Sequence, residues 1–215
     1  MSDNQLNNVT IALTKGRPLT QALKLLSKIG IEPVEDMAVS RKLVFETNRS
    51  GLSLMVLRSV DVATYVEHGI ADMGMAGRDV LLEQGEEGYY QPLDLKIGAC
   101  DLMVAALAEE GPLPARIKVA SKFVNIAKRY YAEKGVQVDV IKLYGAMELA
   151  PVTGLAHRIV DIVETGNTLK ANGLVAIEHI AKVTSRLIVN KTSLKMKHVV
   201  IQGLIDDLAR EVNGE

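Results

Sequence analysis

The sequence has few of the residues on which several classes of binding site depend. It contains one cysteine, Cys100, no tryptophan and two phenylalanines among its 215 residues. A single thiol forms neither an internal disulfide nor a thiolate cluster for zinc, so we expect a reducing compartment and a Cys100 that is simply packed. The scarcity of large aromatic side chains leaves little surface on which the bases of single-stranded nucleic acids could stack.

Long apolar segments and an excess of one charge are also missing. No apolar run approaches the roughly 18 residues that a membrane span requires, and no basic segment followed by an apolar core begins the chain. The 25 basic and 26 acidic residues give a formal net charge of −1, so no overall field attracts nucleic acid or an anionic membrane. The four histidines lack the spacing of metal-binding pairs. We therefore expect a cytoplasmic protein that binds neither nucleic acid nor membranes and that has no metal site made by its side chains alone.

Segments with the character of strands and helices alternate along the chain, as in α/β proteins. Apolar, β-branched runs predict the strands, and apolar residues at helical spacing predict the helices. Ser59 is expected to cap the second helix. The predicted strands are 9–13, 43–46, 52–57, 70–79, 117–120, 136–143 and 158–163. The predicted helices are 19–29, 59–68, 124–134 and 194–212.

Two long extended segments, 89–107 and 174–190, connect the two halves of this alternation. Each is longer than an ordinary strand of about 5–6 residues, so we interpret both as crossovers between two domains. The predicted fold is therefore α/β, with two doubly wound domains, a cleft between them and two crossover strands. Domain I is expected to comprise 1–96 with 182–215, and domain II to comprise 97–181. The amphipathic closing helix is expected to pack on domain I.

The predicted strand at 158–163 runs into a short polar turn with one glycine and two threonines. Such a turn offers backbone N–H groups, hydroxyl groups and the amino end of the next helix to one small volume, which favours an anion. Asp161 and Glu164 repel phosphate, so we expect them to face hydroxyl groups or a metal, and the whole segment suits a ribose 5-phosphate. The alternative is an ordinary turn in which a threonine caps a helix. The turn consists of Glu164, Thr165, Gly166, Asn167 and Thr168.

Three other junctions between predicted elements carry cations. Lys15, Gly16 and Arg17 follow the first strand, Arg41 precedes the second, and Arg58 ends the third. A phosphate at such a junction meets a cation and the amino end of a helix, whereas the alternative is a basic loop in water. Ligands of open α/β sheets bind at the carboxyl ends of strands. Cations in one half and a polar turn with carboxylates in the other therefore predict a polyanionic substrate.

Five motifs cover most of these junctions: LTKGRP, SRKL, TYVEHGIADMGMAGRDVL, VDVIKLYGAMELAP and DIVETGNTLKANGL. Together they resemble the motif set of the ATP phosphoribosyltransferase family, and the similarity extends from about Thr10 to Val212. The resemblance implies a two-domain fold like that of type II periplasmic binding proteins. It also implies ATP and phosphoribosyl pyrophosphate as substrates, phosphoribosyl-ATP and pyrophosphate as products, and Mg²⁺ bound with the substrate phosphates.

The resemblance further implies roles for individual residues. Because N1 of adenine carries a lone pair and no proton, its attack needs no general base, and catalysis depends on alignment and on stabilising the departing pyrophosphate. Arg17 and Arg41 are the expected catalytic contacts of that pyrophosphate. Glu148 binds a ribose hydroxyl or, alternatively, interacts with the amino end of its own helix. The expected contacts of phosphoribosyl pyrophosphate are Glu148, Asp161, Glu164, Thr165, Gly166, Asn167 and Thr168. The expected contacts of ATP are Lys15, Gly16 and Arg58.

The resemblance is to the short form of the family, because the chain ends soon after its closing helix, where the long form continues into a histidine-binding domain. Short-form chains work with a regulatory subunit similar to histidyl-tRNA synthetase in a hetero-octamer, so such a partner is expected. Two other interpretations stay open at this point. One is a phosphoribosyltransferase for another base, and the other is a non-catalytic cleft-binding protein. The missing export signal argues against the second.

Overall fold

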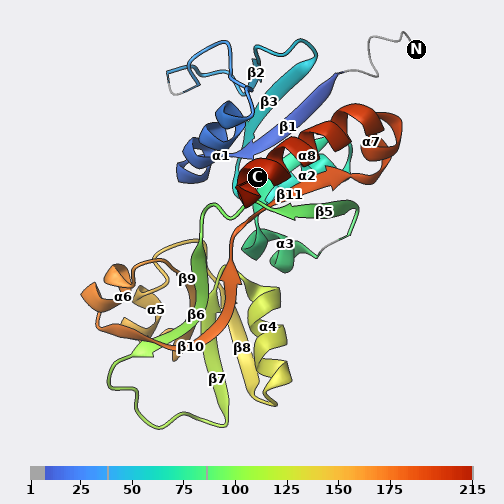
Figure 1. Ribbon diagram of the computed structural model, residues 1–215. Coiled ribbons are helices and arrows are strands. Elements are labelled where there is room, and N and C mark those ends of the chain that lie inside the picture. The colour runs from blue at the N-terminus through green and yellow to red at the C-terminus, as the bar shows by residue number, and fades with distance from the viewer. Residues whose placement is uncertain (1–7, 38, 86, 215) are drawn as a thin grey trace. The chain divides into compact units, whose positions relative to one another are not determined.

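A computed structural model describes residues 8–37, 39–85 and 87–214 (Figure 1). Its contacts divide the chain into two compact units, each with its own sheet. The first unit consists of the described residues up to Leu81, those within Gly85–Gly98 and those from Thr184 onward. The second unit consists of Leu82–Gln84 and Ala99–Val183.

The first unit is built on a six-stranded mixed sheet with the order β2-β3-β1-β4-β11-β5. The central strands β3, β1 and β4 are parallel, and β1 pairs with β3 from Val9 opposite Leu52 to Thr14 opposite Leu57. Strands β2, β11 and β5 are antiparallel to their neighbours. The strands are β1 Val9–Thr14, β2 Val44–Glu46, β3 Leu52–Leu57, β4 Met73–Gly77, β5 Tyr89–Asp94 and β11 Ser185–Asn190.

Helices cover both faces of this sheet, which is doubly wound as predicted (Figure 1). Helices α1 and α8 pack on one face, where Leu26 and Ile201 share a buried cluster with Leu54. On the other face α2 approaches closely, because a Cβ on Gly74 would lie only 2.8 Å from Cγ2 of Val66. The helices are α1 Arg17–Lys28, α2 Ser59–Glu67, α3 Arg78–Gln84, α7 Lys191–Met196 and α8 His198–Asn213.

The prediction of a single closing helix at 194–212 is wrong, because two helices, α7 and α8, meet at Lys197. The side chain of Asn190 starts α7 by accepting hydrogen bonds from the N–H groups of Thr192 at 2.9 Å and Ser193 at 2.8 Å. Helix α8 packs on the first unit, as expected. Within the described ranges, no helix is both long and apolar enough to cross a membrane.

Two other local predictions are wrong. Ser59 is the first residue of α2 rather than its cap, and Arg58 takes the cap position with no side-chain capping bond among the described residues. The strand predicted at 70–79 is shorter, because helix α3 already begins at Arg78. Asp79 lies in the first turn of α3, where a carboxylate favours helix through the macrodipole.

The second unit is built on a five-stranded mixed sheet with the order β10-β6-β9-β7-β8. Helix α4 covers the face that carries Val119 and Val160, and α5 and α6 cover the face that carries Ala120 and Ile159. Cys100 is packed against the α4 side, as expected. The strands are β6 Cys100–Leu107, β7 Arg116–Ser121, β8 Gln137–Lys142, β9 Arg158–Val163 and β10 Leu174–Val183. The helices are α4 Val124–Glu133, α5 Leu149–Val152 and α6 Asn167–Ala171.

The amino end of β9 is held by a network of ion pairs. Arg158 Nε and Nη2 each lie 2.8 Å from one carboxylate oxygen of Glu110, and Arg158 Nη1 lies 3.3 Å from Oε1 of Glu178. Lys134 and the Tyr130 hydroxyl also contact Glu178. Burial raises the pKa of Glu178, but the hydrogen bonds from Lys134 and Tyr130 help to bring this pKa below its usual value. The network therefore ties β9 to β10 and α4.

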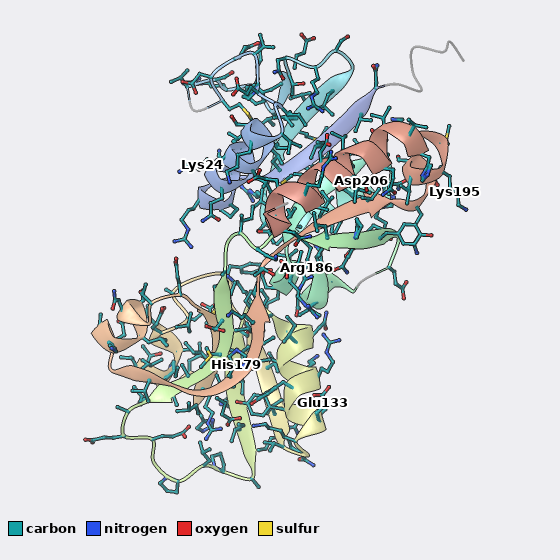
Figure 2. All side chains as sticks on the ribbon, viewed as in Figure 1. Lys24, Glu133, His179, Arg186, Lys195 and Asp206 are labelled. Carbon is teal, nitrogen blue, oxygen red and sulfur yellow. The ribbon has the colours of Figure 1, made fainter. Side chains whose placement is uncertain are left out.

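The two segments that connect the units run side by side in the first unit. The N–H of Leu95 donates to the carbonyl of Ser185 at 2.9 Å, and the N–H of Ser185 donates to the carbonyl of Ile97 at 2.9 Å. Arg186 on β11, labelled in Figure 2, forms an ion pair of 3.0 Å with Asp94 on β5. Each long segment predicted as a crossover therefore contributes one strand to each sheet.

Candidate active site

The second unit contains a pocket of about 260 Å³ at the carboxyl end of β9. Its walls come from β6, from β9 and the turn after it, and from the cap position of α5. Its lining combines apolar side chains of the two strands with residues that carry carboxylate and hydroxyl groups. The polar residues of the lining are Glu148, Asp161, Glu164, Thr165 and Thr168.

Asp161 faces this pocket because of its place in β9. Ile159 packs on the α5 and α6 side of the sheet, and successive strand residues point to opposite faces. Asp161 follows two residues later and therefore lies on the same side as Ile159. Its side chain is 23% exposed, so a ligand that enters the pocket meets a carboxylate with limited access to water.

Glu148 reaches the pocket from the turn between β8 and α5. Ala146 in this turn has a φ of 48°, a left-handed conformation that is uncommon for a residue other than glycine and is often found at functional sites. Met147 is 1% exposed and anchors the turn in the core. Glu148 occupies the cap position of α5, but its side chain makes no capping bond to the described residues of that helix. Its carboxylate lines the pocket instead.

The turn after β9 presents backbone and hydroxyl donors. Gly166 has a φ of 72° and caps α6, a conformation that glycine adopts without steric cost. Thr165 Oγ1 accepts a hydrogen bond of 3.4 Å from the N–H of Asn167, which leaves the hydroxyl proton for another acceptor. Helix α6 has only 5 residues, so its dipole adds little to these donors. Thr165, Gly166 and Thr168 line the pocket, whereas Asn167 is outside the lining.

The sequence pattern did not single out one cation that lies beside this pocket. Lys122 Nζ is 3.5 Å from Oδ1 of Asp161. Ser121, the last residue of β7, is opposite Val160 of β9, so Lys122 and Asp161 are the residues that follow this pair. In the sequence, Lys122 stands between a predicted strand and a predicted helix, as Arg58 does. That position was the one signal that could have pointed to Lys122.

The cations predicted in the first unit gather where β1 and β3 end side by side. The N–H of Lys15 donates to the carbonyl of Leu57 at 2.8 Å, so the turn after β1 adjoins Arg58 at the end of β3. Gly16 caps α1 with a φ of 93°, which lets the chain turn sharply from strand to helix. Arg17 is the first residue of α1, and its side chain is exposed.

Arg41 reaches the same edge from the other side of β3. Strand β2 is antiparallel to β3, and the N–H of Val56 donates to the carbonyl of Leu43 at 2.8 Å. Arg41 precedes Leu43 by two residues, and its side chain is exposed. The neighbouring Lys42 forms an ion pair with Glu35. The edge of the first sheet therefore presents several cations that suit phosphate groups.

The carboxylates of the pocket do not form a complete metal site. Among the described residues, no group of three His, Cys, Asp or Glu side chains is arranged to hold a metal ion. A magnesium ion that arrives with substrate phosphates needs only one or two carboxylates, since the phosphates and water supply its other ligands. Glu148, Asp161 and Glu164 at the pocket fit that smaller requirement.

Comparisons with known proteins identify the family. The HisG family model, described as ATP phosphoribosyltransferase, matches residues 58–213. The chain is 59% identical over 207 residues to ATP phosphoribosyltransferase of Hahella chejuensis, with 96% of this chain and 98% of the relative covered. It is 56% identical over 204 residues to the enzyme of Pseudomonas fluorescens, with 95% and 97% covered.

Solved structures agree with this similarity. The chain matches the ATP phosphoribosyl transferase (HisG:HisZ) complex from Thermotoga maritima at 31% identity and a TM-score of 0.83, covering 96% of this chain and 100% of the matched one. It matches an amino-acid ABC transporter extracellular-binding protein from Bacillus subtilis at 10% identity and a TM-score of 0.58, covering 96% and 91%. The second match shows the predicted fold, that of the periplasmic binding proteins, and nothing of function. With its catalytic relatives aligned over nearly their whole length, the chain belongs to the ATP phosphoribosyltransferase family.

Proposed function

We propose that the pocket of the second unit binds phosphoribosyl pyrophosphate, the sugar donor of this family. The reaction transfers the 5-phosphoribosyl group of the donor to N1 of ATP, releases pyrophosphate and is the first step of histidine biosynthesis. One observation supports the proposal: the same pocket joins carboxylates, which accept from hydroxyl groups, to a turn of N–H and hydroxyl donors, which suit phosphate. A site for ribose 5-phosphate needs both kinds of group, acceptors for its hydroxyls and donors for its phosphate.

The release of pyrophosphate by the purified chain tests this function. We expect release from the donor only when ATP is present, with phosphoribosyl-ATP as the second product. Free adenine and orotate serve as control acceptors. Release with either of them, or without any acceptor, would mean that the chain is a different phosphoribosyltransferase or only hydrolyses the donor.

The 5-phosphate of the donor is assigned to the turn from Glu164 to Thr168. In a crystal soaked with donor and magnesium, we expect the phosphate within about 3.5 Å of N–H or hydroxyl donors of this turn. The ribose hydroxyls should then face Asp161 and Glu148, because a carboxylate accepts hydrogen bonds and repels phosphate. A phosphate farther than this from every donor of the turn would exclude the assignment.

Replacing Thr165 by valine should raise the KM for the donor about 10- to 100-fold, because a hydrogen bond to a charged group contributes about 1.5–3 kcal/mol. Valine keeps the shape of threonine but removes the hydroxyl from the pocket. Steady-state rates at saturating ATP measure the effect. Thr153→Val is the matched control, since the Thr153 hydroxyl donates to the carbonyl of Leu149 at 2.8 Å within its own helical turn. A higher KM for ATP instead of the donor would contradict the assignment.

The basic edge of the first unit is assigned to phosphates of the other substrate and to the leaving group. Lys15, Gly16 and Arg58 are placed at the ATP phosphates, and Arg17 and Arg41 at the departing pyrophosphate. Displacement at the anomeric carbon leaves positive charge on the sugar and builds negative charge on pyrophosphate. N1 of adenine attacks with its own lone pair, so these residues contribute alignment and charge stabilisation and transfer no proton.

Magnesium is the metal that we assign to this reaction, bound with the pyrophosphate of the donor. Asp161 and Glu148, which face the ribose hydroxyls, would hold it through water. When bound, the ion neutralises part of the charge that grows on the leaving group. With or without the ion, the side chains of the pocket orient the sugar.

A regulatory subunit of the HisZ type is the partner that we assign to this chain. The support is the full coverage of the matched chain in the Thermotoga maritima HisG:HisZ complex at a TM-score of 0.83. A partner that senses histidine at its own site regulates this chain only if both sites bias one shared conformational equilibrium. A hetero-octamer is the expected assembly, and light scattering on the mixed subunits measures its mass.

Histidine titration separates this arrangement from sensing by the chain itself. We expect the isolated chain to be active and its steady-state rate to stay flat as histidine is added. Inhibition should appear only after the HisZ-type subunit is supplied, because the second binding site then exists. Strong inhibition of the isolated chain would place a sensing site within the chain and overturn the assignment of the partner.

A further inference from the structure

We infer that Lys122 is a positioning residue, which orients Asp161 toward the sugar of the donor. The inference rests on the proposed function and adds a residue to it. Lys122 is not in the lining of the pocket, but its Nζ lies 3.5 Å from Oδ1 of Asp161, which is in the lining. Lys122 therefore contacts the site through Asp161.

The backbone around Lys122 is fixed by buried neighbours on both sides. Ser121 is 0% exposed, and its Oγ donates to the carbonyl of Val160 at 2.6 Å and accepts from the N–H of Phe123 at 2.9 Å. Phe123 is itself 3% exposed and packs in the core beneath α4. The first of these bonds ties the turn to β9 at the residue before Asp161. Residue 122 thus has little freedom relative to the carboxylate.

The side chain of Lys122 is also guided toward Asp161. Its ammonium lies 4.7 Å from the centroid of the Phe123 ring, a cation–π distance. The side chain is 42% exposed, so its ammonium remains hydrated while it contacts the carboxylate. The ring and the carboxylate together favour one position of the ammonium over the many that a free lysine would adopt.

Both contacts of the Asp161 carboxylate within the described residues involve the same oxygen. Oδ1 accepts a hydrogen bond of 2.8 Å from the N–H of Ile162 and faces Lys122. Rotation of the carboxylate out of its present plane would break both contacts, so the two groups together hold one carboxylate oxygen and the orientation of the carboxylate plane. Oδ2 is left for the pocket, where it can accept from a ribose hydroxyl. Lys122 is thus one of two groups that hold Asp161 in its binding orientation.

Three variants test this role. Lys122→Met should lower kcat/KM for the donor about 10- to 100-fold, because a misplaced sugar loses alignment with the attacking nitrogen. Lys122→Arg keeps a cation at the carboxylate and should restore most of the activity. Lys118→Met removes an exposed lysine of β7, the strand that Lys122 follows, and should behave like the unmodified chain. Equal activity of Lys122→Met and the unmodified chain would overturn the inference.

A double-mutant cycle tests whether Lys122 acts through Asp161. In an Asp161→Asn background, Lys122→Met should change kcat/KM by no more than about twofold, since a residue that works through a missing partner has nothing left to orient. The same loss in both backgrounds would show that Lys122 acts on the substrate or the fold directly and would overturn the inference.

Binding without turnover separates this inference from the proposed function. Calorimetry with ribose 5-phosphate should show weaker binding to Lys122→Met than to the unmodified chain, whereas binding of inorganic pyrophosphate should be equal for both. Weaker pyrophosphate binding alone would make Lys122 a phosphate contact and overturn its positioning role. If the unmodified chain binds no ribose 5-phosphate and releases no pyrophosphate with ATP, the proposed function fails. If it does both and Lys122→Met binds ribose 5-phosphate equally well, only the inference fails.

Discussion

Replacing Arg41 by alanine is expected to lower kcat about 100- to 1000-fold, a loss of about 3–4 kcal/mol of transition-state stabilisation. Negative charge grows on pyrophosphate as its bond to the anomeric carbon breaks, so a guanidinium at this group binds the transition state more tightly than the donor. Arg41 is exposed at the edge where β1 and β3 end and is accessible to a ligand. Steady-state kinetics should show the loss in kcat with little change in the KM for the donor.

Lys42→Ala is the matched control for this prediction. It removes the same charge one residue away, but Lys42 is 60% exposed and already paired with Glu35, and such surface pairs contribute little. Its kcat should stay near that of the unmodified chain. An unchanged kcat with a raised KM for Arg41→Ala would instead make Arg41 a ground-state clamp of the donor. Equal losses of kcat in both variants would mean that the summed positive charge of the basic edge, and not a direct contact of Arg41, stabilises the transition state.

Strands β3 and β9 could be predicted closely because each is a short run rich in β-branched and leucine residues. Strand β3 spans Leu52–Leu57 and β9 spans Arg158–Val163, as these runs predicted. Such a run gives a dense local signal that does not depend on distant contacts. The turn after β9 was predicted two residues too long, because α6 already begins at Asn167, although its donors all come from five consecutive residues.

The elements that were missed depend on contacts from distant parts of the chain. Helix α3 is only 7 residues long and follows β4 directly, without a capping side chain among the described residues. Helices α7 and α8 look like one amphipathic segment until Asn190 caps the first of them. The Asn190 amide also donates to the carbonyl of Val66 at 2.8 Å, at the end of α2. No local sequence pattern predicts that one side chain will form hydrogen bonds at the ends of two different helices.

Dependence on contacts between distant parts of the chain also explains why Lys122 was not predicted as a residue of the site. Its proximity to Asp161 follows from the pairing of β7 with β9, in which Ser121 and Val160 are 39 residues apart. Periodicity predicts that each strand exists but does not say which strands are neighbours. Each predicted site residue was singled out by the pattern of its own local segment, whereas the contact of Lys122 with Asp161 exists only in the assembled sheet.

One mostly buried ion pair in the first unit illustrates how strongly such distant contacts can matter for stability. Asp72 and Lys197 are 125 residues apart, and Nζ of Lys197 lies 2.8 Å from Oδ1 and 3.0 Å from Oδ2 of Asp72. Oδ2 also accepts from the N–H of Thr10 at 2.9 Å, and Nζ donates to the carbonyl of Asn8 at 2.5 Å. The pair thus joins β1, the residue before β4 and the junction of α7 and α8, with side-chain exposures of 7% and 18%.

Asp72→Asn is expected to lower the free energy of unfolding by about 3–5 kcal/mol, the usual result of removing one partner from a buried ion pair. The ammonium of Lys197, whose side chain is 18% exposed, then stays in a mostly buried position beside a neutral amide. Urea denaturation measures the loss, and the first unit should unfold at a lower urea concentration than in the unmodified chain.

Two comparisons decide whether burial of the unpaired charge is the cause. Asp72→Asn combined with Lys197→Met should cost less than the sum of the two single changes, because no lone charge is then left in the interior. Glu211→Gln breaks the pair of Glu211 with Lys28, whose lysine is 63% exposed, and should cost at most about 1 kcal/mol. If Asp72→Asn costs no more than Glu211→Gln, or if the double variant shows the full sum, then Asp72 contributes through its separate hydrogen bonds rather than through charge pairing.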